Sequence, residues 1–263
     1  MSSPGIVAAL ASEARLLGPA RPRGAVSALG DGTLLVVSGM GPCAAAEAAQ
    51  RLVAAGAGAL VSFGVAGGLD PALAAGALVL PEEVITPDGA RLATAREWRE
   101  RVSAAVADRH PASYGALLTS PEPLSSPEEK ESAFRQTGAV AVDMEGFAIA
   151  EVAARRGVPF LAVRTVLDTV DDTLPLSVLA AIDARGAAHF GRLLGALVRA
   201  PREWPQVLRL VRRSRAAARP LVSVARSGAL ASPTARQETA ADPPTASAES
   251  RAAAPRDRPL GVP

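Results

Sequence analysis

Two short acidic segments contain residue types that could cleave a nucleoside. Asp143 and Glu145 lie close together, and Asp168 follows after a stretch long enough for a helix and a strand. Breaking the bond between a purine and its ribose needs an acid for the leaving base, a group that holds the sugar and a group that holds the nucleophile. Asp168 can supply the proton, and Glu145 can accept hydrogen bonds from two ribose hydroxyls. These carboxylates predict an enzyme that acts on a glycosidic bond.

The hydrophobic pattern indicates how these carboxylates could meet. It predicts a buried strand over 139–143, a helix over 145–156 and a second strand over 160–166. If the strands are parallel and the helix crosses between them, both acidic segments lie at carboxyl ends of strands. Ligand crevices in open α/β sheets form at such ends.

Two further residues complete the candidate site. Glu13 follows a strand expected over 6–10 and is the candidate to orient water or phosphate. Arg164 lies inside an apolar strand, so it needs a partner whether its role is catalytic or structural. Asp143 and Glu13 are the candidate partners.

The same carboxylates also have purely structural explanations. Asp168 could cap a turn, Glu145 suits the exposed N–H groups at a helix start, and Glu13 could simply face solvent after a strand. On the residues alone, both explanations stay open.

Strand-like and helix-like patterns alternate over the first 200 residues and predict a mostly parallel or mixed sheet covered by helices. With 263 residues and 49% hydrophobic composition, the chain can bury a sizeable core. The strands are expected over 6–10, 33–38, 59–64, 77–85, 114–119, 139–143 and 160–166. The helices are expected over 43–55, 96–108, 127–136, 145–156 and 187–198.

The net charge of +2 hides an uneven distribution. Residues 1–191 carry 15 basic and 21 acidic side chains, whereas residues 192–226 carry nine Arg and one Glu. The basic segment contains a predicted amphipathic helix, with one apolar and one basic face. The apolar face holds Trp204, Val207, Leu208 and Val211, and the basic face holds Arg209, Arg212 and Arg213. Since single-stranded nucleic acid would require more stacking aromatics than Trp204, no nucleic-acid partner is expected.

Other sequence features exclude several classes of protein. The single cysteine, Cys43, excludes an internal disulfide, and His110 and His189 are too few for a zinc cluster, so no metal is expected. No long uncharged apolar run and no basic secretory region occur, so a cytoplasmic location is expected. From Ser227 the composition becomes typical of a disordered tail. The predicted division is therefore 1–200, 201–226 and 227–263.

Five segments resemble one family in both sequence and order. The chain is similar to the nucleoside phosphorylase and methylthioadenosine/S-adenosylhomocysteine nucleosidase superfamily across residues 5–200. This resemblance implies a single three-layer α/β/α domain with a twisted mixed sheet, no cofactor and a homo-oligomer. The segments are Ile6–Glu13, Ser38–Gly41, Ser62–Leu69, Val142–Glu145 and Val163–Asp168.

The resemblance also implies roles for individual residues. Asp168 matches the general acid toward purine N7, Glu145 the ribose-hydroxyl ligand, and Glu13 the glutamate that organises water. Met144 matches the residue that packs against the sugar, and Arg164 an arginine near the same site. The turn expected over Gly64–Gly68, which includes Ala66 and Gly67, matches the loop whose backbone lines the base and sugar pocket.

Three departures from the family pattern leave the nucleophile open. Val65 and Leu167 stand where the nucleosidases usually have serine, and Ser62 stands near the place of the usual phosphorylase arginine. Neither water nor inorganic phosphate as a co-substrate is favoured by this comparison.

A narrower resemblance points to a lipid-linked substrate. Residues 168–176, the compact segment 120–130 and the Arg-rich end are similar to bacterial hopanoid-associated phosphorylases. That resemblance implies adenosylhopane as the adenine nucleoside, with release of adenine to give ribosylhopane or phosphoribosylhopane. The basic amphipathic helix fits this substrate, because arginines attract anionic lipid and aliphatic residues enter the interface. The enzyme would then be peripheral on the inner face of the cytoplasmic membrane.

Alternatives to this interpretation stay open. The wider resemblance fits a soluble methylthioadenosine/S-adenosylhomocysteine nucleosidase or a purine nucleoside phosphorylase. The replacement of serine by Val65 and Leu167 also allows a non-catalytic nucleoside-binding or membrane-scaffold protein. The Arg-rich helix could equally be a solvated basic face or an oligomer contact.

Overall fold

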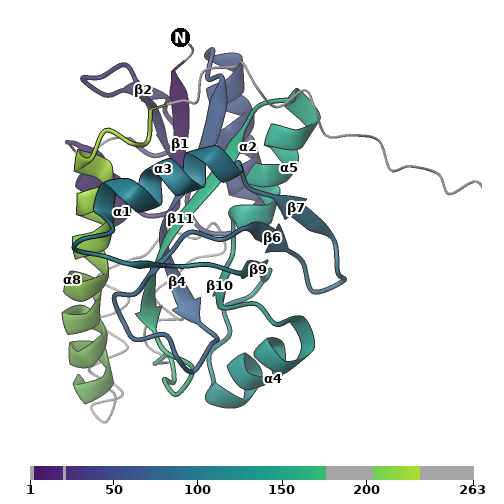
Figure 1. The fold of residues 1–263 in the computed structure, drawn as a ribbon, viewed down its shortest axis with the longest axis vertical. Coiled ribbons are helices and arrows are strands. Elements are labelled where there is room, and N and C mark those ends of the chain that lie inside the picture. The colour runs from purple at the N-terminus through teal and green to yellow at the C-terminus, as the bar shows by residue number, and fades with distance from the viewer. Residues whose placement is uncertain (1–2, 20–21, 176–203, 232–263) are drawn as a thin grey trace, which may run out of the picture. The chain divides into compact units, whose positions relative to one another are not determined.

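The structure is a computed structural model that describes residues 3–19, 22–175 and 204–231 (Figure 1). In this part of the chain, eleven strands form one mixed sheet. Its main path has the order β2-β3-β1-β4-β10-β9-β6-β7, while β11 pairs with β4 and β5, and β5 pairs with β8. The longest strands are β4 (Ala59–Gly68) and β11 (Phe160–Asp168). The others are β1 (Pro4–Ala8), β2 (Ser27–Ala28), β3 (Leu34–Val37), β5 (Leu78–Val79), β6 (Glu83–Ile85), β7 (Arg91–Ala93), β8 (Ala112–Ser113), β9 (Ala116–Thr119) and β10 (Ala141–Asp143).

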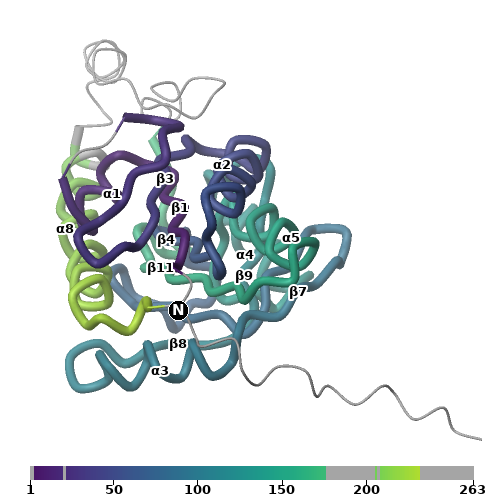
Figure 2. The backbone as a smooth tube through the Cα atoms, turned by 90° about the horizontal axis from the view of Figure 1, so that it is seen from above, coloured from purple at the N-terminus to yellow at the C-terminus, as the bar shows by residue number. Residues whose placement is uncertain are grey.

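Helices cover both faces of the sheet, which confirms the predicted α/β/α architecture. On one face, α2 (Pro42–Ala54) and α5 (Gly146–Arg156) contribute mainly small and aliphatic side chains to the core. On the other face lie α1 (Ala11–Leu17), α3 (Arg96–Val106) and α8 (Trp204–Arg226), as the view from above shows (Figure 2). Aliphatic side chains dominate both cores, so the low aromatic content does not prevent close packing.

The remaining helix, α4 (Pro127–Thr137), begins and ends with strong local signals. Ser126 accepts a hydrogen bond from the N–H of Glu129, whose side chain in turn accepts from the N–H of Ser126, which is a capping box. Gly138 ends the helix in the left-handed conformation that glycine adopts readily. These signals fix the start of α4 beside the loop 120–126.

Two predicted elements near the glycine-rich segment need correction. Residues 64–68 are not a turn, because β4 continues through them and pairs with β10 on one side and β11 on the other. The strands β10 and β11 are not parallel neighbours, since β4 lies between them, antiparallel to β10 and parallel to β11. Pairing with one or both of these neighbouring strands keeps the glycines extended.

The strand predicted over 77–85 is divided in the structure. β5 pairs with β11 and β8, whereas β6 pairs with β9 and β7. Pro81 lies between the two strands and has no N–H to donate to a ladder. The chain therefore changes its strand partners at this proline.

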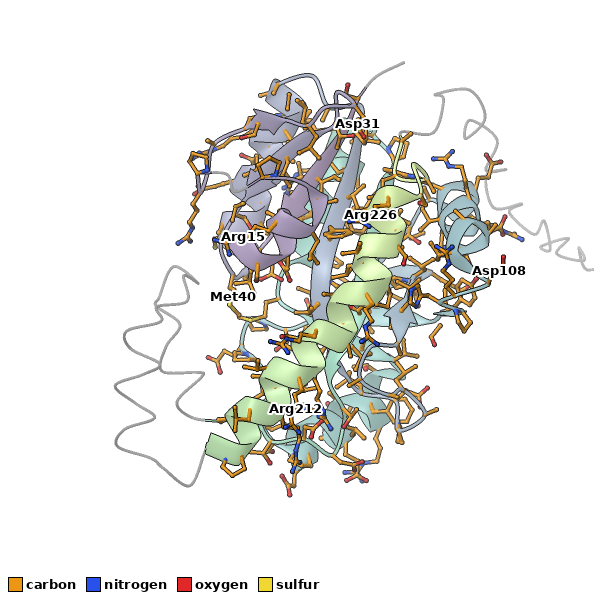
Figure 3. The ribbon with its side chains drawn as sticks, turned by 90° about the vertical axis from the view of Figure 1, so that its left-hand side faces the viewer. Arg15, Asp31, Met40, Asp108, Arg212 and Arg226 are labelled. Atoms are coloured by element: carbon orange, nitrogen blue, oxygen red, sulfur yellow. The ribbon has the colours of Figure 1, made fainter. Side chains whose placement is uncertain are left out.

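The helix α8 belongs to the same compact unit as the sheet, which spans Met1–Pro233. The side chains of Ala217, Leu221 and Val224 in its second half are buried. Arg212 lies in its first half and Arg226 at its end (Figure 3). Residues 227–231, assigned to the tail from sequence, continue this packing, because Trp98 Nε1 donates to the carbonyl oxygen of Ala229 at 3.0 Å. The predicted helix 187–198 and the rest of the tail lie outside the described residues.

Candidate active site

A cavity opens where the ends of β4, β10 and β11 meet the loop that follows β1. It contains about 610 Å³ of space free of protein atoms, part of it open to solvent. Six of the seven site residues predicted from the sequence line this cavity: Glu13, Ala66, Gly67, Met144, Glu145 and Asp168. Its other lining residues are mostly apolar: Ala9, Leu10, Met40, Val65, Pro123, Leu124, Val142, Leu167 and Leu174, with Glu122 and Asp143.

The register of three strands explains why distant carboxylates meet here. Val142 on β10 and Asp168 on β11 are both paired with Gly67 on β4, from opposite sides. Asp143, which ends β10, therefore lies at the same level of the sheet as Asp168, which ends β11. The expected convergence of the two acidic segments is thus found, although it depends on β4 and not on two adjacent parallel strands.

Glu13 is the third residue of α1 and is buried. Its Oε2 accepts from the N–H of Leu10 and its Oε1 from the N–H of Val65, both at 2.9 Å. Burial raises the pKa of Glu13 above its ordinary value, although the charge of Arg164 and the backbone N–H groups act in the opposite direction. A Cβ at Gly64 would lie 2.3 Å from Glu13 Oε1, so this carboxylate needs glycine at that position.

Glu145 precedes the first turn of α5 and is also buried. Its Oε1 accepts from the N–H of Gly41 at 2.7 Å, and its Oε2 lies 4.0 Å from Arg164 Nη2. Burial and the neighbouring charge of Asp143 raise the pKa of Glu145 to about 7. The hydrogen bond from Gly41 fixes one carboxylate oxygen and leaves the group on the cavity wall.

Arg164 is almost fully buried and holds Asp143 firmly. Its Nε and Nη2 donate to Asp143 Oδ2 at 3.0 and 2.6 Å, and Nη2 also donates to Ser62 Oγ at 2.6 Å. Asp143 accepts further hydrogen bonds from Thr119 Oγ1 and from the N–H of Gly146. Of the two candidate partners left open by the sequence, Asp143 is the one that pairs with Arg164. Arg164 itself does not line the cavity, and its role as a substrate ligand stays a prediction.

Asp168 has a buried partner that the sequence analysis missed. Lys130 from α4 is fully buried, and its ammonium donates to Asp168 Oδ2 and to the carbonyl oxygens of Thr169 and Asp172, the last two at 2.9 and 2.8 Å. Burial raises the pKa of Asp168 above its ordinary value, while Lys130 and Arg213 act to lower it. Lys130 is the only lysine among 28 basic residues, and that rarity was the one available signal.

Comparison with known proteins identifies the family. Residues 23–199 match the model of the phosphorylase superfamily. The chain belongs to the phosphorylase superfamily. A search of curated proteins finds no match.

Solved structures share the fold of this superfamily member at low sequence identity. The methylthioadenosine/S-adenosylhomocysteine nucleosidase of Helicobacter pylori, with butyl-thio-DADMe-Immucillin-A, has a TM-score of 0.62 at 18% identity, covering 85% of this chain and 97% of that one. The corresponding nucleosidase of Neisseria meningitidis has a TM-score of 0.60 at 19% identity, with coverages of 86% and 100%. Native futalosine hydrolase of H. pylori has a TM-score of 0.60 at 18% identity, with coverages of 85% and 97%. These similarities establish the shared fold.

Membership of this superfamily makes the protein an enzyme of the nucleosidase or nucleoside phosphorylase type, and such enzymes need no cofactor. In residues 3–19, 22–175 and 204–231, no cluster of His, Cys, Asp or Glu has the arrangement of a metal site. In the same ranges, no helix is long and apolar enough to cross a bilayer.

Proposed function

We propose that the protein cleaves the N-glycosidic bond of an adenine nucleoside, with Asp168 as the acid that protonates the leaving base. Glu145 holds the ribose hydroxyls, Met144 packs against the sugar, and Glu13 orients the nucleophile. The observation that carries this proposal is the convergence of three buried carboxylates with raised pKa values on one cavity. Perturbed acids that share a cavity are typical of catalytic sites.

The proposed chemistry uses these carboxylates in different ways. The raised pKa of Asp168 lets this group carry a proton at a higher pH than an exposed aspartate could. As the bond breaks, positive charge develops on the ribose, and carboxylates on the cavity wall stabilise it electrostatically. Glu13, held by two backbone N–H groups, has the fixed orientation that a nucleophile-binding group requires.

Charge in the cavity favours water over phosphate as the nucleophile. Among the described residues, no Lys or Arg side chain lines the cavity, whereas five carboxylates do: Glu13, Glu122, Asp143, Glu145 and Asp168. A phosphate anion would be repelled by those of these groups that are ionised, and no cation on the described part of the cavity wall would bind it. We therefore expect hydrolysis, with adenine and a free ribosyl product.

The proposed substrate is adenosylhopane. Support comes from the sequence resemblance of residues 120–130 and 168–176. Residues 122–124, Asp168 and Leu174 from these segments line the cavity, and Leu10, Leu124 and Leu174 make part of its wall apolar. The nucleosidases of similar fold favour the alternative of methylthioadenosine as substrate.

Adenine release separates these possibilities. The full chain is incubated with adenosylhopane in detergent and, separately, with methylthioadenosine, each with and without phosphate. Adenine from adenosylhopane at a rate independent of phosphate supports the proposal. Turnover of methylthioadenosine alone selects the alternative substrate, and dependence on phosphate overturns water as the nucleophile. Calorimetric binding of both nucleosides without adenine release overturns the proposed function.

We also propose that the first half of α8 lets the enzyme contact an anionic membrane surface. In this half, Leu208 is 55% exposed and Val211 is 48% exposed. Exposed Arg209, Arg212 and Arg215 flank these aliphatic side chains. Exposed aliphatic residues between arginines are typical of helices that lie in a bilayer interface. Such contact would place the enzyme on the inner face of the cytoplasmic membrane. The homo-oligomer implied by the family resemblance stays a prediction.

Sedimentation with phosphatidylglycerol-containing vesicles tests this contact. We expect binding that weakens with salt and with the variant R209A/R212A/R215A, because each arginine near an anionic surface contributes about 1 kcal/mol. Arg213 is left unchanged because it pairs with Asp172. Full-length protein that does not sediment with these vesicles contradicts the membrane proposal.

A further inference from the structure

Lys130 combines several features that ordinary packing does not require. It lies in the first turn of α4, where the helix dipole disfavours a positive charge, and its side chain is only 1% exposed. Removing an ammonium from water costs several kcal/mol unless its donors are satisfied. The three donors meet three acceptors, which are Asp168 Oδ2 and the carbonyl oxygens of Thr169 and Asp172.

The partners of Lys130 all belong to the segment that carries the acid. Asp168 ends β11, and Thr169 and Asp172 form the turn that follows it. The Asp172 carboxylate closes this turn by accepting from the N–H and the Oγ1 of Thr169 at 2.8 and 2.7 Å. The ammonium therefore fixes both the side chain of Asp168 and the backbone immediately after it.

We propose that Lys130 is the positioning residue for the acid: it holds Asp168 by Oδ2 and so presents the other carboxyl oxygen to the leaving base. This inference rests on the proposed function, because it assigns a partner to the group that protonates the base. Lys130 does not line the cavity and touches no substrate in this account. It acts only through Asp168.

The charge of Lys130 has a second consequence for the acid. Burial raises the pKa of Asp168, and the ammonium limits that rise. Other charged groups also surround Asp168. They are Arg213 from α8, Asp171 and Asp172 from its own loop, and Glu13, Glu122, Asp143 and Glu145 on the cavity wall. Since Lys130 is the cation in direct contact, its removal should make Asp168 a weaker acid.

The variant Lys130→Met removes the charge and keeps a long side chain. We expect its kcat to fall at least tenfold, because general acid catalysis contributes about 10²- to 10⁴-fold. We also expect the alkaline limb of its kcat profile to move to higher pH by about one unit or more, since that limb reports the pKa of the acid. If Lys130→Met does not fold, Lys130→Gln keeps a hydrogen-bond donor and still removes the charge.

A matched control tests whether an effect of Lys130→Met comes from the lost contact with Asp168 or from a general destabilisation of α4. Ser126→Ala removes the N-cap of the same helix and leaves the contact between Lys130 and Asp168 in place. We expect the pH profile of Ser126→Ala to remain that of the wild type. A profile of Lys130→Met that matches the wild type, or a loss of kcat shared equally by both variants, overturns the proposal.

A spectroscopic measurement tests the contact without any substrate. Because Lys130 is the only lysine, protein labelled with ¹³C- and ¹⁵N-lysine gives one set of side-chain resonances. We expect these resonances to shift as Asp168 titrates, and the shift to vanish in Asp168→Asn. An identical titration in Asp168→Asn overturns the proposed contact. Full activity of Asp168→Asn would instead overturn the proposed function, so the two failures are distinguishable.

Discussion

Two groups of buried charged side chains lie next to the cavity, and they differ in the ratio of carboxylates to cations. In the Arg164 cluster (Glu13, Asp143, Glu145 and Arg164), three carboxylates share one guanidinium. In the Lys130 pair (Lys130 and Asp168), one carboxylate has its own ammonium. An excess of negative charge suits a site for a sugar that becomes positive, whereas a one-to-one pair suits an acid with a fixed orientation. In the proposed mechanism, this difference separates the carboxylates that face a developing positive charge from the carboxyl group that gives up a proton.

Of the variants considered, removal of the Arg164 guanidinium should have the largest effect. Arg164→Met leaves Asp143 buried without its cation, and we expect the free energy of unfolding to fall by about 3–5 kcal/mol. Urea denaturation measures this loss. The control Arg155→Met breaks an exposed pair with Glu151 and should cost less than about 1 kcal/mol. Equal losses in the two variants would contradict the central place of Arg164 in its cluster.

Loss of the nucleophile-orienting carboxylate should lower the rate while leaving the Lys130 pair intact. For Glu13→Gln we expect kcat to fall about 10²-fold. The glutamine amide can accept from only one of the two backbone N–H groups, and the nucleophile loses the carboxylate that orients it. Steady-state adenine release measures this change. Glu47→Gln, an exposed change on α2, serves as the control. Wild-type kcat in Glu13→Gln would remove this residue from the mechanism.

The raised pKa of Glu145 in the Arg164 cluster should make the free energy of unfolding depend on pH. The pKa of Glu145 rises from 4.5 to about 7, so the native state retains a proton that the unfolded state has lost between these values. Stability contributed by this group therefore falls as the pH increases through that window. Glu145→Gln removes this dependence, which should change the pH-dependent part of the unfolding free energy by about 1–3 kcal/mol. Parallel stability curves for the two proteins would contradict the raised pKa.

The sequence predicted the members of the Arg164 cluster better than it predicted the Lys130 pair. The acidic members of the Arg164 cluster follow strands or begin helices, so local patterns and family motifs located them. The need of a buried cation for a partner gave Asp143 and Glu13 as candidates for Arg164, and the structure shows the pair with Asp143. Lys130 could not be paired with Asp168 in this way, because the contact joins α4 to the end of β11 and depends on tertiary packing.

For the fold, too, local sequence patterns predicted the elements, whereas long-range strand pairing was not predicted. Hydrophobic periodicity predicted a mostly parallel or mixed sheet covered by helices and most of the longer elements, and the family resemblance implied the α/β/α layers. It did not predict that β4 continues through Gly64–Gly68, because the pairing of those glycines with β10 and β11 is a long-range property. The short strands β2, β7 and β8 were also missed, since two or three residues carry too little periodicity to recognise.

The central claim is that Asp168 protonates the leaving base in this cavity. Its most direct test is adenine release by the wild type and by Asp168→Asn, with adenosylhopane and methylthioadenosine as substrates over a range of pH. Asparagine keeps the shape of the side chain and cannot donate a carboxylic proton, so we expect a loss of kcat of about 10²-fold or more. Adenine release by Asp168→Asn at the wild-type rate would contradict the account.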